Sequence, residues 1–271
     1  MIRASAIILL ALLGTVSVRA QLTLHLTFDS SGALLQDGSA NQFAQDYVQG
    51  TIGHTASGVA GGAAEFNGSS YVRWNSSVAA TLAGSFTVSL WINTTQGFGL
   101  FEGEPAYAGA GIVYADVPGH STDAIPLALS GTRAAFMTDD GNTDTTIHST
   151  SAINTGTWMH LASTYDVTTG VMRLYVNGTL QASATVATVS HNARGLLFLG
   201  ANDFDSRYFT GAVDDFQLYS VALSAADVSF LAQNPGLVAV PEPPVHALIG
   251  LGLGGVAWLH RRRQARPAGQ A

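Results

Sequence analysis

Oxygen-rich side chains in two parts of the sequence could hold a hard cation. The N-terminal loop places Asp37, Ser39 and Asn41 at alternate positions, and a late segment carries the acidic pair Asp214 and Asp215. Calcium binds several oxygen ligands drawn from carboxylates, amides and backbone carbonyls. These two groups are therefore the candidate calcium ligands, and calcium is the only cofactor for which the sequence makes a positive case.

Asp214 lies in an alternating segment over residues 211–219, where Phe216 and Leu218 are expected to face the core. Because strand side chains alternate with a period of two, Asp214 is expected on the same face. An inward carboxylate is costly unless it is paired or bound to a metal. The alternative that needs no metal is a hydrogen-bonded Asp that caps a turn.

Catalytic patterns are weaker. Retaining glycoside hydrolases need two carboxyl groups about 5 Å apart. Glu102 and Glu104 share one face of an extended segment, but Pro105 follows at once. The sequence has no cysteine, no GxSxG elbow, and no HExxH or P-loop motif. We therefore predict that the chain is not an enzyme, and an atypical glycoside hydrolase that uses Glu102 or Glu104 is the alternative.

The acidic cluster at residues 139–144 departs from EF-hand spacing, so we expect a solvated hairpin tip there.

The charge of the central region excludes one class of partner. Residues 21–239 hold five arginines and seventeen carboxylates, a formal charge of −12, and the chain has no lysine. Binding of phosphate backbones requires a basic surface, so nucleic acid is not an expected partner. The lack of cysteine means that an exported form would be stable without disulfides.

Alternation of apolar and polar residues is the commonest pattern in the centre of the chain. It is clear over residues 22–28, 86–92 and 172–176, where it predicts strands with one buried face. Asn177-Gly178 follows one of these runs and predicts a tight type I′ hairpin. The segment from Gly103 to Ala124 is weakly patterned and is expected to be a surface loop.

One helix is predicted, from Ser224 to Ala232, with Ser224 as its cap and Asp227 closing the capping box. Many short strands with Gly-rich turns and one terminal helix predict an all-β, antiparallel two-sheet sandwich or jelly roll. The domain is expected to span residues 21–235.

The two ends of the chain have the composition of sorting signals. Residues 1–20 combine Arg3, an apolar run and Val18-Arg19-Ala20, which predicts a secretory signal peptide and a mature start at Gln21. Residues 236–271 hold a Pro-rich motif, an apolar Gly-rich stretch and an arginine cluster. By the positive-inside rule, such a tail enters the inner membrane with its arginines in the cytoplasm. A simple C-terminal membrane anchor is the alternative.

This tail resembles the PEP-CTERM sorting signal of Gram-negative bacteria. The resemblance rests on an ordered set of residues: Pro241, Glu242 and Pro243, then the apolar stretch, then Arg261, Arg262 and Arg263. It implies recognition and cleavage by an exosortase-type membrane protease. The expected location is the cell surface or extracellular matrix, after transient anchoring in the membrane.

Four central segments resemble, in order, the laminin-G-like jelly roll of the concanavalin A-like lectin and glucanase superfamily. They are GGAAEFNGSSYVRW (61–74), SFTVSLWINT (85–94), GTWMHLASTYDVTTGVMRLYVNGTL (156–180) and LFLGANDFDSRYFTGAVDDFQLYSVALSAADV (197–228). The resemblance implies that Asp37, Asn41 and Asp214 close on one calcium ion. Trp91 and Trp158 are expected in the core, and His160 as a hydrogen-bonded structural histidine.

These observations favour a non-catalytic surface or matrix protein that binds an extracellular glycan or polymer through loops or a concave sheet face. The alternative is a structural envelope component without a small ligand. The sequence does not identify the ligand.

Overall fold

The computed structural model describes residues 22–99, 103–115, 122–191, 195–202 and 206–239. The predicted signal peptide and the sorting-motif residues Pro241, Glu242, Pro243 and Arg261 to Arg263 lie outside the described residues. The chain divides into two compact units, residues 1–239 and 240–271. Among the described helices, none is both long and apolar enough to span a membrane.

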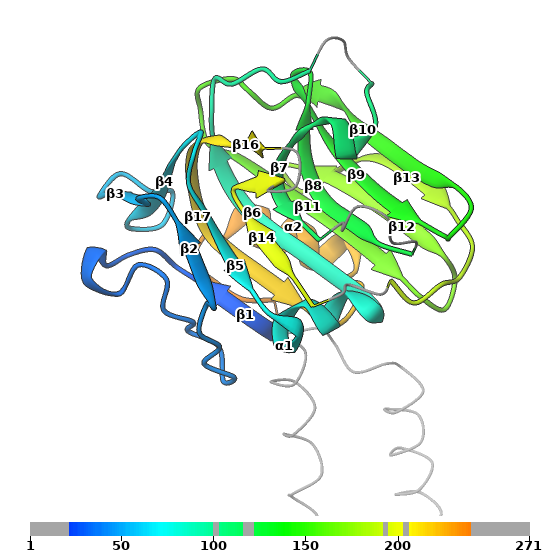
Figure 1. Ribbon diagram of the computed structural model, residues 1–271, viewed down its shortest axis with the longest axis horizontal. Coiled ribbons are helices and arrows are strands. Elements are labelled where there is room, and N and C mark those ends of the chain that lie inside the picture. The colour runs from blue at the N-terminus through cyan, green and yellow to red at the C-terminus, as the bar shows by residue number, and fades with distance from the viewer. Residues whose placement is uncertain (1–21, 100–102, 116–121, 192–194, 203–205, 240–271) are drawn as a thin grey trace, which may run out of the picture. The chain divides into compact units, whose positions relative to one another are not determined.

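Sheet A has eight strands in the described residues, in the order β13-β12-β11-β6-β17-β4-β3, with β1 paired to β17 (Figure 1). Every pairing in it is antiparallel. Its strands are β1 (Leu22–Leu26), β3 (Gly53–Thr55), β4 (Ala63–Asn67), β6 (Phe86–Asn93), β11 (Met159–Asp166), β12 (Val171–Val176), β13 (Thr179–Thr185) and β17 (Thr210–Tyr219).

Sheet B follows the order β10-β9-β8-β7-β14-β5-β2, with the short pair β15 and β16 attached to β7. All its pairings are antiparallel except that of β16 with β7. Its strands are β2 (Tyr47–Gln49), β5 (Tyr71–Trp74), β7 (Ala110–Tyr114), β8 (Ala124–Ser130), β9 (Arg133–Asp139), β10 (Asp144–Ala152), β14 (Leu197–Leu199), β15 (Ala201–Asn202) and β16 (Arg207–Tyr208).

The largest buried cluster joins apolar side chains of both sheets, as in a β-sandwich. A smaller cluster attaches helix α2 (Ala225–Gln233) to the outer face of sheet A through Val228 and Leu231. The other helical turns are η1 (Ser31–Ala33), α1 (Ser76–Ala79), η2 (Ala80–Ala83) and η3 (Ala106–Ala108). The predicted fold class, a two-sheet antiparallel sandwich with one short C-terminal helix, is confirmed.

Local sequence signals for the hairpin and the helix are also confirmed. Asn177 and Gly178 link β12 to β13 with φ of 49° and 74°, the two positive values that a type I′ turn requires. Ser224 caps α2 and forms a reciprocal capping box with Asp227. The acidic cluster lies at the turn between β9 and β10, where Asp139 and Asp140 accept backbone N–H groups of the turn.

Two expectations were wrong. The segment from Gly103 to Ala124 is not a plain surface loop, because it contains β7, whose five residues are all buried. A strand buried on both faces has no alternation to detect. Trp91 and Trp158 are only partly buried, and the tryptophan of the core is Trp74, which has no exposed surface.

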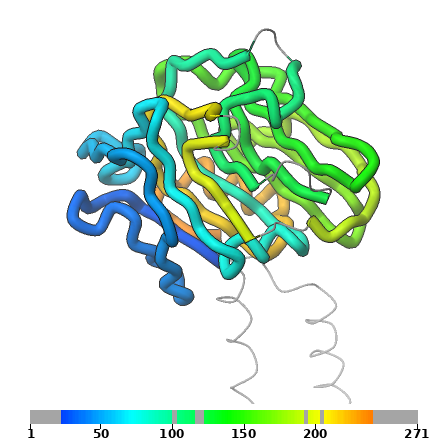
Figure 2. Tube along the Cα trace, in the orientation of Figure 1, coloured from blue at the N-terminus to red at the C-terminus, as the bar shows by residue number. Residues whose placement is uncertain are grey.

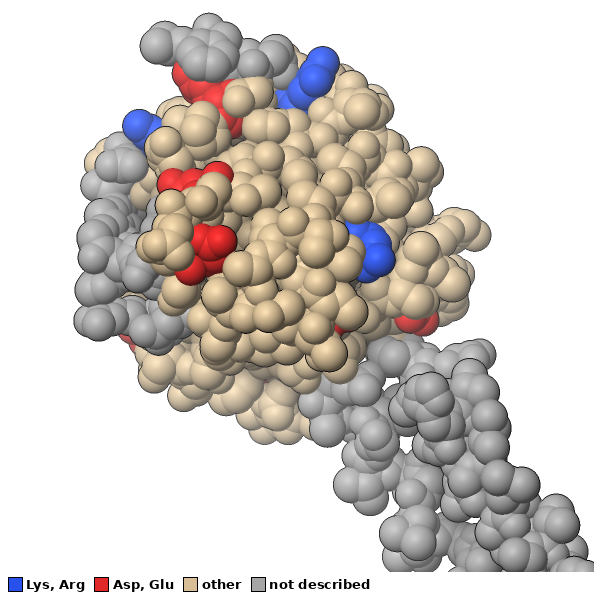
Figure 3. Space-filling view, turned by 90° about the vertical axis from the view of Figure 1, so that its right-hand side faces the viewer, with Lys and Arg blue, Asp and Glu red and all other residues tan. Residues whose placement is uncertain are grey.

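The surface carries few charges. Figure 3 shows the end of the sandwich formed by β10 and β13, where most of the visible surface belongs to uncharged residues. At the opposite end, the N-terminal loop lies beside the segment that contains β2 and β3 (Figure 2). This end holds the open surfaces described next.

Candidate functional site

The predicted metal ligand Asp37 is a buried acceptor that ties the N-terminal loop to β1. Its Oδ1 accepts the backbone N–H groups of His25 (3.0 Å) and Ser39 (2.8 Å). Its Oδ2 accepts the Ser39 hydroxyl and the Phe43 N–H, both at 2.8 Å. Asn41 faces β1 with its amide Nδ2, which donates to the carbonyl oxygen of Thr23 at 2.8 Å.

Asp214 is fully buried and holds a different loop. Its Oδ2 accepts the N–H groups of Val59 (2.7 Å) and Ala60 (3.0 Å), in the β3–β4 connection, and its Oδ1 accepts the N–H of Asp215 (2.7 Å). Burial raises the pKa of Asp214 to about 6, although these three N–H groups act in the opposite direction. The loop fits closely, since a Cβ on Gly58 would lie 2.6 Å from Oδ2 of Asp214.

Asp215 occupies a β-bulge and ties β17 to two further segments, β1 and the C-terminal segment. Its φ is 50°, and the register of β17 against β6 shifts between Asp214 and Gln217. Its Oδ1 accepts from His25 Nε2 and Gln217 Nε2, both at 2.8 Å, and its Oδ2 accepts the Gly236 N–H at 2.9 Å. Phe216 and Leu218 face the core as expected, but the extra residue of the bulge interrupts the alternation on which the placement of Asp214 relied.

The C-terminal strap, residues 234–239, continues this network along β17. Gln217 Nε2 donates to the Leu237 carbonyl oxygen at 2.9 Å, and the Ala239 N–H donates to the Tyr219 hydroxyl at 2.9 Å. Tyr219 in turn donates to Gln217 Oε1. Alternate residues of β17 therefore hold the strap by its backbone. We call Asp214, Asp215, Gln217 and Tyr219 the β17 hub.

The predicted calcium ligands accept hydrogen bonds from two different sets of protein donors. Asp37 and Asn41 share the N-terminal loop, whereas Asp214 accepts from a separate set of donors. Both carboxylates accept hydrogen bonds from N–H or O–H donors, so each is satisfied within the protein. No cluster of three His, Asp or Glu side chains suited to a metal occurs in the described part of the chain.

Of the two candidate catalytic acids, the structure describes Glu104. Glu104 is 8% exposed, and a Cβ on Gly99 would lie 2.1 Å from its Oε2, so its carboxylate packs against backbone. Glu102 lies outside the described residues. His160 is buried as a structural residue, with Nε2 2.9 Å from the Ser89 hydroxyl, and burial lowers its pKa to about 4.

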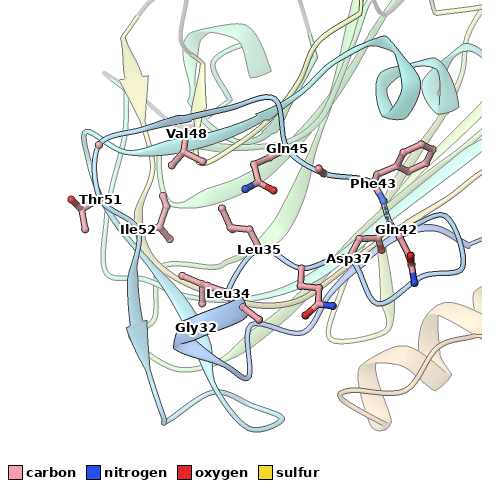
Figure 4. Close-up of a pocket in the computed structure, with 14 residues that line it drawn as sticks. Gly32, Leu34, Leu35, Asp37, Gln42, Phe43, Gln45, Val48, Thr51 and Ile52 are labelled. Carbon is pink, nitrogen blue, oxygen red and sulfur yellow. Dashed lines mark hydrogen bonds between the residues drawn. The ribbon is translucent and has the colours of Figure 1, made fainter.

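A groove of about 700 Å³ opens where the N-terminal loop crosses the edge strand β2 (Figure 4). Leu35, Val48 and Ile52 point into it from separate segments, and Gln45 lies beside them. We call this cavity the β2 groove. It is lined by Gly32, Ala33, Leu34, Leu35, Gln36, Asp37, Gln42, Phe43, Ala44, Gln45, Val48, Gly50, Thr51 and Ile52.

The opposite face of β2 carries a row of tyrosines. The ring of Tyr47 lies 5.9 Å from that of Tyr71, which stacks on Tyr208 at 6.3 Å. The Arg73 guanidinium lies 5.0 Å above the Tyr47 ring and forms an ion pair of 2.9 Å with Asp46. Tyr47 is 42% exposed, so part of its aromatic ring is open to solvent.

Sequence reasoning did not find β2 or its groove. The strand has only three residues, Tyr47 to Gln49, too few for a periodic signal. Exposure of Tyr47 and Val48 follows from their place at a sheet edge, which depends on tertiary structure. The only local indication of a binding surface in this segment is Tyr47, which follows Asp46 and is flanked by Gln45 and Gln49.

The fold and its segments define the class of protein. The family model of the concanavalin A-like lectin/glucanases superfamily matches residues 66–229, so the chain belongs to this laminin-G-like family. Comparison with curated protein sequences gives no match.

Among solved structures, domain 4 of AbnA, a GH43 extracellular arabinanase from Geobacillus stearothermophilus in complex with arabinotriose, is 26% identical with a TM-score of 0.60. The match covers 79% of this chain and 99% of that one.

Two toxin structures share the fold at lower identity. The binding domain of Paraclostridial Mosquitocidal Protein 1 is 16% identical with a TM-score of 0.59, and the match covers 79% of this chain and 52% of that one. The binding domain of botulinum neurotoxin DC in complex with SialylT is 18% identical with a TM-score of 0.57, covering 80% and 52%. The chain thus spans about half the length of these toxin domains.

Proposed function

We propose that the chain is a non-catalytic exported protein that binds an extracellular polysaccharide at β2, through the β2 groove and the exposed ring of Tyr47. The observation that carries the proposal is the arrangement on one edge strand, where Tyr47 offers an aromatic face on one side and Val48 lines the groove on the other. Binding sites for small molecules combine apolar walls with a few polar groups in this way.

The comparisons support this assignment. Domain 4 of the arabinanase, the 26% identical relative, is in complex with arabinotriose, and it is matched over nearly its whole length. A carbohydrate is therefore the ligand class that we assign to this chain. The packed carboxylate of Glu104 favours binding over hydrolysis.

Affinity electrophoresis of the full-length chain in gels that contain soluble polysaccharides tests the proposal. We expect retardation by at least one polymer, and loss of it in Tyr47→Ala and in Val48→Asp, which places a charge in the groove. Leu180→Ala is the matched control, because Leu180 is an exposed apolar residue on sheet A. Lack of retardation across the panel, or equal retardation of all variants, would overturn the proposal.

We also propose export through the signal peptide over residues 1–20 and sorting by an exosortase-type protease that acts on the PEP-CTERM tail of a Gram-negative bacterium. Mass spectrometry of the chain recovered from the cell surface and medium checks this. A mature N-terminus at Gln21 and loss of the segment after Pro243 are expected. An intact chain in the inner membrane would contradict the processing step.

Calcium binding by Asp37, Asn41 and Asp214 stays a proposal from the family resemblance. In the structure these carboxylates accept hydrogen bonds from backbone N–H groups, which a bound calcium ion would have to share or displace. Isothermal titration of calcium into metal-free protein, with thermal unfolding in parallel, checks it. Absence of both heat and a rise in the melting temperature would exclude calcium.

A further inference from the structure

The ionisable groups around β2 restrict which polysaccharide it can bind. Asp37 is the only ionisable side chain among the fourteen residues that line the β2 groove, and no arginine or lysine is present there. Its carboxylate already accepts four hydrogen bonds. The groove therefore lacks a cationic group that could pair with a carboxylate or sulfate on a ligand.

The arginine that lies over Tyr47 on the tyrosine face of β2, Arg73, already has a carboxylate partner. Arg73 donates to both carboxylate oxygens of Asp46, through Nη2 at 2.9 Å and Nε at 3.5 Å. Its guanidinium also covers the Tyr47 ring at 5.0 Å. An acidic sugar would have to compete with Asp46 for this guanidinium, since recognition of carboxylates by arginine uses the same donor pair.

The long-range field has the same sign as these local groups. Residues 21–239 carry a formal charge of −12, and the whole chain has no lysine. Such a field lowers the concentration of polyanions near the surface and slows their association, most strongly at low ionic strength.

The groups that stay open to a ligand are neutral. The side chains of Gln36, Gln42, Gln45 and Thr51 line the groove, and amides and hydroxyls both donate and accept hydrogen bonds. Leu35, Val48 and Ile52 provide apolar walls between them. This lining matches a chain of uncharged sugars, whose hydroxyl groups meet the amides and whose C–H faces meet the walls.

We infer that the β2 groove selects neutral polysaccharides and rejects acidic ones. This inference rests on the proposed glycan-binding function and adds the chemical class of its ligand. It predicts that a polymer loses affinity when carboxylates are introduced, even where its backbone is unchanged.

Three polymers test the inference in affinity electrophoresis of the full-length chain at low and high salt: arabinan, fully methyl-esterified polygalacturonate and unesterified polygalacturonate. The last two share one backbone and differ in charge. We expect a neutral polymer to retard the protein at least about 10-fold more strongly than polygalacturonate, a difference of about 1.4 kcal/mol in binding free energy.

A charge added to the groove should change the specificity. Gln45→Arg is expected to bind polygalacturonate in a salt-sensitive manner, whereas Gln233→Arg, the same change on helix α2, is not. Polygalacturonate binding as tight as that of the neutral polymers by the unmodified chain would overturn the inference and leave the glycan-binding function standing. If neither these three polymers nor any polymer of the wider panel retards the protein, both the glycan-binding function and the inferred selectivity are overturned.

Discussion

The β17 hub and the β2 edge use polar residues in opposite ways. In the hub, both carboxylate oxygens of Asp214 and of Asp215 accept hydrogen bonds, and most of the donors belong to other segments. At β2, Tyr47 and Val48 are exposed and the groove between segments stays open. The acidic pair Asp214 and Asp215 thus links segments of the fold, whereas β2, a short neutral strand, provides the surface that we propose for a ligand.

The physical reason for this difference is the cost of burial. A buried carboxylate must be satisfied, and for Asp37 and Asp214 backbone N–H groups supply most of the hydrogen bonds. An edge strand pairs with a neighbouring strand on one side only, so its side chains stay accessible to solvent. The comparison predicts that changes in buried carboxylates reduce stability, and that changes at β2 reduce binding.

The largest expected effect is on stability. Asp37→Ala leaves the backbone N–H groups of His25, Ser39 and Phe43 without their acceptor, so the free energy of unfolding should fall by about 3 kcal/mol. Urea denaturation measures it. Asp46→Ala, which breaks an ion pair whose two side chains are each 28% exposed, is the control and should cost less than about 1 kcal/mol. Equal losses of stability in the two variants would contradict the role of Asp37 as a buried hydrogen-bond acceptor.

A pH-dependent effect is expected from Asp214. Its pKa is raised to about 6 from 3.8, so the folded state holds the proton more tightly than the unfolded state. Its contribution to stability is therefore fully present below pH 4 and is lost as the pH rises through 6. Asp214→Asn removes this dependence, so the stability gap between wild type and variant should shrink from pH 4 to 7 by on the order of 1 kcal/mol.

Two buried histidines also make the stability depend on pH, so the effect of Asp214 must be read as the difference between wild type and Asp214→Asn. Burial lowers the pKa of His160 and of His191 to about 4, so their contribution is present above pH 6.5 and is lost as the pH falls toward 4. Because both proteins keep these histidines, the difference between them isolates Asp214. A gap that does not vary with pH would contradict the raised pKa.

A smaller loss should follow removal of one hydroxyl from the hub. Tyr219→Phe deletes the acceptor of the Ala239 N–H and the donor to Gln217, and it keeps the ring in the packed cluster. We expect about 1 kcal/mol of lost stability and faster amide hydrogen exchange in residues 234–239. Polysaccharide binding should be unchanged. Protection of the strap equal to that of wild type would show that packing alone holds it.

The smallest stability effect is expected at the groove. Gln45→Ala should change the free energy of unfolding by less than about 0.5 kcal/mol, because the side chain lines an open surface. Binding of a neutral polysaccharide should weaken about 5-fold, close to 1 kcal/mol. Isothermal titration and urea denaturation of the same preparation check both values. A large stability loss with intact binding would reverse the comparison on which the proposed site depends.

Local chemistry made much of the fold predictable. Asn177-Gly178 dictates its hairpin and Ser224 with Asp227 dictates the helix start, because both depend on neighbours within a few residues. Alternation identified β6 and β12 for the same reason. Strand β7 escaped prediction because its two buried faces remove the polar positions that mark a strand.

The site was less predictable because it depends on contacts between distant segments. The bulge at Asp215 has no signature in the sequence, because a φ of 50° is uncommon for residues other than glycine. The extra residue interrupts the period-two alternation of side chains along β17, on which the placement of Asp214 relied. The groove exists only because residues 32–45 cross the edge of β2. Neither feature follows from residue type or spacing.

The strap also determines where a mechanical load enters the domain. Tension applied at Ala239 passes through Tyr219, Gln217 and Asp215 into β17. That strand is hydrogen-bonded to β6 and also to β1 and β4, so it lies in the interior of sheet A. A force applied at this end therefore pulls on an interior strand rather than peeling an edge strand from the sheet.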